Sequence, residues 1–90
     1  MKLILNGLGV VEITDAKRVP GDDIIIESAD NFQSISKVVG YEIKEAYLVE
    51  VDFKWTFIAW LNVPDDYYID DSAVFYIENQ DDIYRLNARL

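Results

Sequence analysis

The sequence contains no cysteine and no histidine among its 90 residues. Without cysteine there is no disulfide framework and no thiolate nucleophile. Small secreted domains often depend on such cross-links, so we expect a cytoplasmic protein. Without histidine the chain lacks the side chain that most often transfers protons near neutral pH, and also the commonest nitrogen ligand of zinc. Both absences weigh against an enzyme.

Long apolar runs are missing as well. The longest, Trp55 to Leu61, is far shorter than the roughly 20 residues that a membrane-spanning helix needs. The N-terminal run from Met1 to Gly7 is too short for the apolar region of a signal peptide. We therefore expect no membrane association. The length fits one globular domain over residues 1–90, and an apolar fraction of 51% is enough for one small core.

Glycine and proline are scarce, with four and two residues, so their positions are informative. Asn6-Gly7 lies between the β-rich segments 2–6 and 10–14, which predicts a hairpin. A phosphate-binding loop is the weaker interpretation, because the third glycine of that motif is missing. Pro20-Gly21 predicts a type II turn within a loop over residues 15–23. The following segment, 24–26, reads as a buried strand.

One segment has helical periodicity. Apolar residues recur at helical spacing over residues 30–39, Asp30 is placed to cap the first turn, and Gly40 follows the end. The sequence therefore predicts one short helix near 31–39.

From Tyr41 to Leu61, apolar side chains recur at every second position, the period of a strand with one buried face. One strand of this length would extend roughly 70 Å at about 3.3 Å per residue, too long for a small domain. We expect a turn near Asp52 to Lys54, or else a bulge or bend between two sheets. The aromatic residues expected in the core on this parity are Phe53, Trp55 and Phe57.

The last third continues the β pattern. Residues 67–69 suggest a short edge strand, and the segments 73–78 and 83–89 suggest a hairpin with its loop at residues 79–82. The predicted fold is mostly β, a small antiparallel barrel or sandwich of about six or seven strands with the one helix. An α+β arrangement is the alternative.

Charge is the other strong signal. The net charge is -9, and eight of the 17 acidic residues stand in four doublets, Asp22-Asp23, Asp65-Asp66, Asp70-Asp71 and Asp81-Asp82. Each doublet precedes an apolar stretch, which is typical of the start of a strand. A protein of this charge is repelled by nucleic acid and by anionic membranes, and is attracted to basic surfaces of other proteins.

The acidic residues do not predict a chemical site. Four carboxylates within residues 65–71 suggest calcium, but two tyrosines and an isoleucine occupy the middle, where a calcium loop has glycine and small residues. Turn formation by Asp is the better interpretation. Neighbouring Asp residues on a strand point to opposite faces, so a doublet is not a general acid and base pair. We predict no catalytic, cofactor-binding or metal-binding residues.

Trp60 falls on the opposite parity, together with Thr56 and Ile58. Either both faces of this strand are covered or an apolar patch is exposed for a partner. Coverage is the preferred interpretation.

These observations favour a non-enzymatic binding protein. It would place an acidic, tyrosine-bearing surface on a basic, nucleic-acid-handling site of another protein, as an inhibitor or nucleic-acid mimic. Many small phage-encoded proteins are similar in character. The alternative is a structural or assembly subunit, which leaves a homo-oligomer open. The residues expected at the partner surface are Asp65, Asp66, Tyr67, Tyr68, Asp70, Asp71, Asp81, Asp82 and Tyr84.

Overall fold

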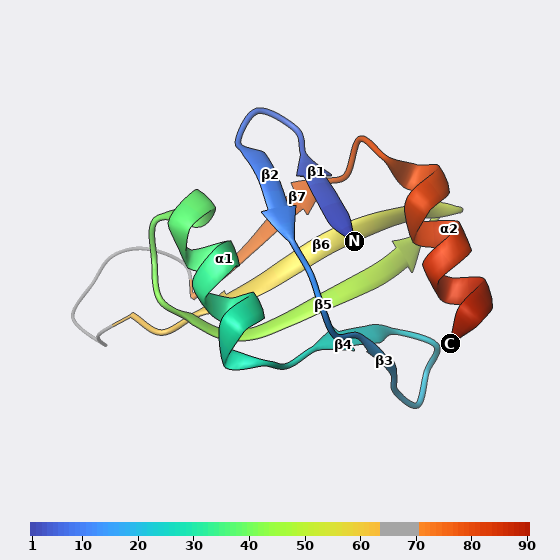
Figure 1. Ribbon diagram of the computed structural model, residues 1–90, viewed down its shortest axis with the longest axis horizontal. Helices are drawn as coiled ribbons and strands as arrows, with labels where there is room; N and C mark the ends of the chain where they lie inside the picture. The colour runs from blue at the N-terminus through green and yellow to red at the C-terminus, as the bar shows by residue number, and fades with distance from the viewer. Residues whose placement is uncertain (64–70) are drawn as a thin grey trace.

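The computed structural model describes residues 1–63 and 71–90. Within these residues the chain forms a two-stranded and a five-stranded antiparallel sheet and two helices (Figure 1). The strand order is β1-β2 in one sheet and β3-β4-β5-β6-β7 in the other. The predicted mostly-β fold is confirmed, and it is sandwich-like instead of a closed barrel. The elements are β1 (Lys2–Leu5), β2 (Gly9–Glu12), β3 (Lys17–Arg18), β4 (Ile24–Ile26), α1 (Ala29–Val39), β5 (Ile43–Val51), β6 (Lys54–Leu61), β7 (Ser72–Tyr76) and α2 (Gln80–Arg89).

The first hairpin forms at Asn6-Gly7 as expected, with Gly7 at φ 79°. It does not stand alone, because its turn meets the end of β7. The Asn6 amide donates to the Tyr76 carbonyl (3.0 Å), and the Glu78 amide donates to the Ile4 carbonyl (2.8 Å). These bonds place the hairpin over the five-stranded sheet, where its apolar side chains enter the core.

Helix α1 begins at Ala29, one residue before the segment with helical periodicity. Its N-cap is Ser28, whose hydroxyl accepts from the Asn31 amide (3.2 Å), so the expected capping by Asp30 is wrong. Gly40 ends the helix in the left-handed conformation (φ 89°), which glycine adopts without steric strain. The capping matters because it brings Asn31 into the core, where it is only 1% exposed.

The second long hairpin, β5–β6, turns at Asp52-Phe53, within the region predicted from the sequence. The side-chain parity of β5, however, differs from the expectation. A β-bulge between Ile43 and Glu45 shifts the register, so that Ala46 and Leu48 are buried and Tyr47 faces the other side. A bulge adds one residue to one strand and thereby exchanges the two faces beyond it.

Strand β6 keeps the predicted parity. Trp55 and Phe57 are buried in the core, but Phe53 lies in the turn and is 89% exposed, so its predicted burial is wrong. A residue at a hairpin tip has no sheet neighbour to cover it, whatever parity it shares with the strand.

Two local assignments are also corrected. Residues 83–89 are not a strand, and residues 79–82 are not a hairpin loop: they belong to helix α2 and its N-cap, Asn79. Ile83 and the partly buried Leu86 recur at helical spacing, and Asp81 and Asp82 stand in the first turn, where the helix dipole favours acids. In addition, the predicted loop 15–23 contains the short strand β3, which pairs with β4.

The core lies between the two sheets. In Figure 1, α1 and the β1–β2 hairpin cross in front of the five-stranded sheet, and α2 lies near one end of it. The side of that sheet facing these elements, the inner face, carries the buried side chains. They include Ile24, Ile26, Ala46, Leu48, Trp55, Phe57, Ala59 and Leu61.

Candidate functional site: the outer face of the five-stranded sheet

Most of the predicted partner residues fall in one segment. Asp65, Asp66, Tyr67, Tyr68 and Asp70 lie outside the described residues. Asp71, Asp81, Asp82 and Tyr84 are described, and their positions bear on whether the acidic doublets gather into one surface.

The described members do not gather. Asp71 directly precedes β7, whereas Asp81 and Asp82 open helix α2. The start of β7 and helix α2 lie toward opposite ends of the long axis in Figure 1, along which the molecule extends 40 Å. Asp71 therefore acts on a different part of the surface from Asp81 and Asp82.

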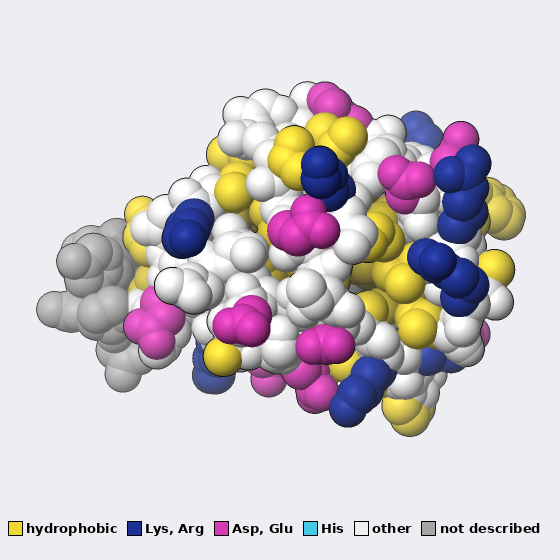
Figure 2. All heavy atoms as spheres, viewed as in Figure 1, with side chains coloured by type: hydrophobic (Ala, Val, Ile, Leu, Met, Phe, Trp, Pro, Cys, Tyr) yellow, Lys and Arg dark blue, Asp and Glu magenta, His cyan; other side chains and the backbone are white. Residues whose placement is uncertain are grey.

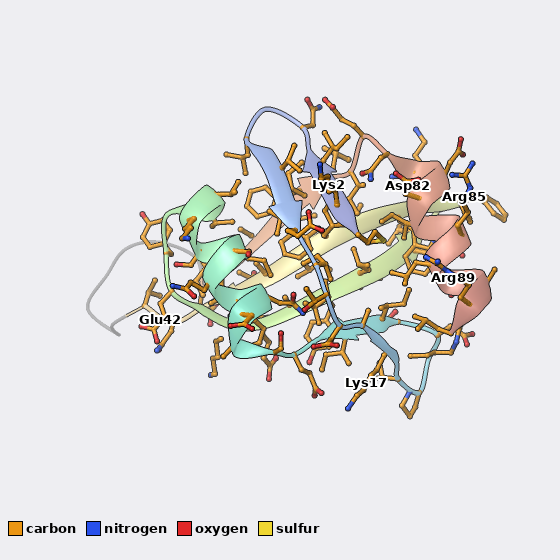
Figure 3. All side chains as sticks on the ribbon, in the orientation of Figure 1. Lys2, Lys17, Glu42, Asp82, Arg85 and Arg89 are labelled. Carbon is orange, nitrogen blue, oxygen red and sulfur yellow. The ribbon has the colours of Figure 1, made fainter. Side chains whose placement is uncertain are left out.

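Basic side chains surround Asp82. Its carboxylate accepts from Asn79 Nδ2 (3.0 Å) and pairs with Arg85 Nη1 (3.4 Å). Figure 3 shows Arg85 and Arg89 on α2 at one end of the molecule and Lys2 on β1 nearer its middle, and Figure 2 shows basic side chains gathered at the α2 end. The open groove at this place, of about 810 Å³, is lined by Met1, Lys2, Asp82, Arg85, Ala88 and Arg89. The predicted negative field at α2 is thus offset by neighbouring cations.

Exposed apolar and aromatic side chains also lie elsewhere, on the side of the five-stranded sheet opposite the core. We call it the outer face. Its members share one side by register: Ile25 pairs with Tyr47, Tyr47 with Ile58, and Ile58 with Val74. Val49, Thr56 and Tyr76 are paired in the same way and form the next row across the sheet. Trp60 lies in the row on the opposite side of Ile58. The outer face comprises Ile25, Tyr47, Val49, Thr56, Ile58, Trp60, Val74 and Tyr76.

The outer face is open to solvent. Tyr76 is 71% exposed, Val74 61% and Trp60 38%. Among residues 1–63 and 71–90, the elements outside this sheet pack against its inner face. The coverage expected on the Trp60 side is therefore not supplied by these residues, and the exposure of Trp60 favours the alternative, an exposed patch. An antiparallel sheet with one solvent-facing side normally carries polar residues there.

The sequence indicates three of the eight members of this face, Thr56, Ile58 and Trp60, as an apolar second parity of β6. The alternation over residues 41–61 puts Tyr47 and Val49 on the parity expected to be buried, because no proline or glycine marks the bulge in β5. Ile25 belongs to a segment that reads as buried. Val74 and Tyr76 join them only through pairing with β6, which is a long-range contact.

Tyr47 has an acidic environment on this face. Its hydroxyl donates to the Glu45 carboxylate at 3.3 Å. Partial desolvation of the phenol raises the pKa of Tyr47 above its ordinary value of 10.0, with further contributions from Glu45, Glu27 and Asp23. Among these acids, Glu27 is paired with Lys17 at 3.7 Å. The β3–β4–β5 flank of the outer face thus carries more negative than positive charge.

Residues 1–63 and 71–90 contain no group of three or more acidic side chains placed to hold a metal ion. In the same residues, no helix has the length and apolar character to cross a membrane. The outer face remains the candidate site because of its exposure and its aromatic content.

Comparison with known proteins found no matching family, no matching curated protein and no matching solved structure. The candidate site therefore rests on the geometry of this chain.

Proposed function

We propose that this protein is a non-enzymatic binding protein that docks its outer face on another protein and blocks the surface that it covers. The observation that supports this is the row of exposed apolar and aromatic side chains across the sheet, with Val74 and Tyr76 as its most exposed members. Solvent-exposed patches of this kind mark interaction sites on soluble proteins, and tyrosine and tryptophan are enriched at interfaces.

The size of the outer face fits a compact contact. Its members lie on four strands, β4 to β7, which span about 14 Å at about 4.8 Å apart, and Thr56 to Trp60 extend about 13 Å along β6, so the face measures roughly 200 Å². A stable complex buries about 800 Å² per partner, so further contacts must surround this face.

Charge indicates the kind of partner. The chain has a net charge of -9, and Asp23, Glu27 and Glu45 lie close enough to Tyr47 to contribute to its raised pKa, with Glu27 paired to Lys17. Arg18 and Lys44 are the other basic residues of β3 and β5. The complementary partner surface is apolar at its centre with lysine or arginine at its margin. A basic site that handles nucleic acid has this character, so we propose an inhibitor of such a site. The dispersed positions of Asp71, Asp81 and Asp82 favour this over detailed mimicry of a phosphate backbone.

The experiment uses immobilised wild-type protein to capture a partner from a lysate of the cells that contain it, with elution by salt. The double variant Val74→Ser, Tyr76→Ser should bind the purified partner at least 30-fold more weakly, because both side chains lose contact area. Leu8→Ser, Val10→Ser is the matched control, since both residues are exposed but belong to the other hairpin. Equal affinity of wild type and the Val74, Tyr76 variant contradicts the proposal.

A second function, a structural or assembly subunit, has one observation in its favour. The same outer face, and the edge strand β7 beside it, offer a surface for a second copy. Acidic residues on the face disfavour self-association at low salt. Sedimentation at micromolar concentration in low and high salt separates the two: a symmetric oligomer with little salt dependence supports assembly, and a monomer in both supports the binding protein.

A further inference from the structure

The tip of the β5–β6 hairpin combines two costly features. Asp52 and Phe53 both adopt positive φ, at 51° and 64°, and the Phe53 side chain is 89% exposed. A two-residue turn with both residues left-handed normally uses Asn-Gly or Asp-Gly, because a bulky side chain is strained there. In the β1–β2 turn of the same protein the positive φ values fall on Gly7 and Gly9. The Phe53 side chain is not buried, so no burial of the ring offsets the strain of its backbone.

Contacts from α2 hold this tip in place. The Tyr84 hydroxyl donates to the Phe53 carbonyl, and the Tyr84 ring meets Trp55 edge to face with centroids 6.3 Å apart. Two residues after the turn, the Trp55 amide donates to Gln80 Oε1 at 2.7 Å, and Gln80 Nε2 donates to the Trp55 carbonyl at 2.8 Å. The backbone beneath Phe53 is therefore fixed from one side while its ring points into solvent.

We propose that Phe53 is an anchor side chain that enters an apolar pocket on the partner protein. This inference rests on the proposed binding function and extends its surface. Val51, 52% exposed, follows Tyr47 and Val49 on the same side of β5, so the tip continues the outer face. Residues whose strained backbone is held in place by surrounding contacts occur mostly at binding and catalytic sites. A rigid aromatic side chain on a preorganised turn loses little entropy on binding.

The charged residues beside Phe53 indicate which residues should surround the pocket on the partner protein. Asp52 is exposed beside Phe53, and Glu50 lies close enough to Tyr84 to contribute to its raised pKa, after desolvation of that phenol. Lys54 is the one basic side chain in the segment from Glu50 to Trp55. The complementary site is a pocket for one phenyl ring with a lysine or arginine placed to meet Asp52. Such a pocket agrees with the basic margin expected around the outer face.

The first test needs no partner. Phe53→Gly relieves the left-handed strain, so the melting temperature should rise by about 3–6 °C even after the added freedom of glycine in the unfolded chain. Leu8→Gly is the control, because Leu8 is an exposed apolar residue in a hairpin turn without positive φ, and its melting temperature should not rise. A fall for Phe53→Gly would show that Phe53 serves the fold and would overturn the proposal.

The second test measures binding to the partner that the wild-type protein captures. Phe53→Gly should weaken the affinity for this partner about 30-fold or more. In a separate measurement, a photoreactive phenylalanine at position 53 should cross-link to the partner, whereas one at position 8 should not. If Phe53→Gly binds normally while the Val74, Tyr76 variant does not, the anchor is wrong and the outer face stands. If Phe53→Gly loses affinity while the Val74, Tyr76 variant binds normally, the anchor is supported and the outer face is wrong as the docking surface. If neither variant loses affinity, or no partner is captured, both proposals fail.

Discussion

Asn31 is a buried polar residue in an otherwise apolar core, and its contacts explain its place. Its Oδ1 accepts from the Thr14 amide (2.8 Å) and hydroxyl (3.1 Å), and its Nδ2 donates to the Asp15 carbonyl (3.1 Å). These bonds join the first turn of α1 to the chain that leaves β2. The backbone groups near Thr14 have no partner on a neighbouring strand. The side-chain amide of Asn31 therefore forms their hydrogen bonds instead.

Replacing Asn31 with alanine should lower the free energy of unfolding by about 2–3 kcal/mol, since it removes these partners from partly buried groups. Urea denaturation measures the change. Gln33→Ala, on the exposed side of the same helix, should stay within about 0.5 kcal/mol. Similar values for the two variants would contradict the assigned role of Asn31.

The raised pKa of Tyr47 determines the direction in which this residue makes protein stability depend on pH. The folded protein binds the phenolic proton more tightly than the unfolded chain, so stability from this group is complete below pH 10.0 and declines as the pH rises above it. Glu45→Gln should move the pKa of Tyr47 back toward 10.0, because one nearby negative charge disappears. Tyrosinate absorbance of wild type and Glu45→Gln, each compared with its Tyr47→Phe counterpart, measures the shift. An unchanged titration would contradict the contribution of Glu45.

At the scale of elements, helix α2 contacts the β5–β6 hairpin through Tyr84 and, with the larger number of hydrogen bonds, through Gln80. Gln80 bonds both backbone groups of Trp55, and its Nε2 also donates to the Ile77 carbonyl at 2.9 Å. The residue stands at the first position of α2, which explains why residues 79–82 do not form a hairpin loop. The helix start serves as a connection between β6 and the chain after β7.

Gln80→Leu keeps the volume of the side chain and removes these bonds, so the free energy of unfolding should fall by about 2–3 kcal/mol. Hydrogen exchange gives a local measurement: the Trp55 amide should exchange faster, whereas the Phe57 amide, farther along β6, should change little. Gln33→Leu is the matched control on an exposed site. If the Trp55 amide stays protected in Gln80→Leu, the connection is not what holds the hairpin.

For the whole molecule, charge is the dominant property. A net charge of -9 on 90 residues repels itself in the compact state. Among the described acids of the doublets, Asp22 and Asp23 precede β4, Asp71 precedes β7, and Asp81 and Asp82 stand in the first turn of α2. In the binding function that we propose, this charge favours basic partners at a distance, and the outer face supplies the contact specificity.

The stability of the protein should therefore rise with added sodium chloride, because salt screens the repulsion. Melting temperature over a salt series measures this. The variant Glu42→Lys, Glu78→Lys replaces two exposed acids, and each exchange adds two units, so the net charge becomes -5 (-9 plus 4). Its melting temperature should respond less to salt. An equal response in both proteins would show that net charge does not set the salt dependence.

The sequence by itself determined the elements that depend on neighbouring residues. Asn6-Gly7 and Gly40 marked a turn and a helix end because their left-handed backbone is a local preference, and the alternation over β6 marked a one-sided strand. Composition likewise determined the charge and the lack of cysteine and histidine chemistry. Only the tertiary structure decided the rest. The bulge in β5, the pairing of β7 with β6 and the start of α2 against Trp55 depend on contacts between distant residues. Those contacts place Tyr47, Trp60 and Tyr76 on one open face and leave Phe53 at its end.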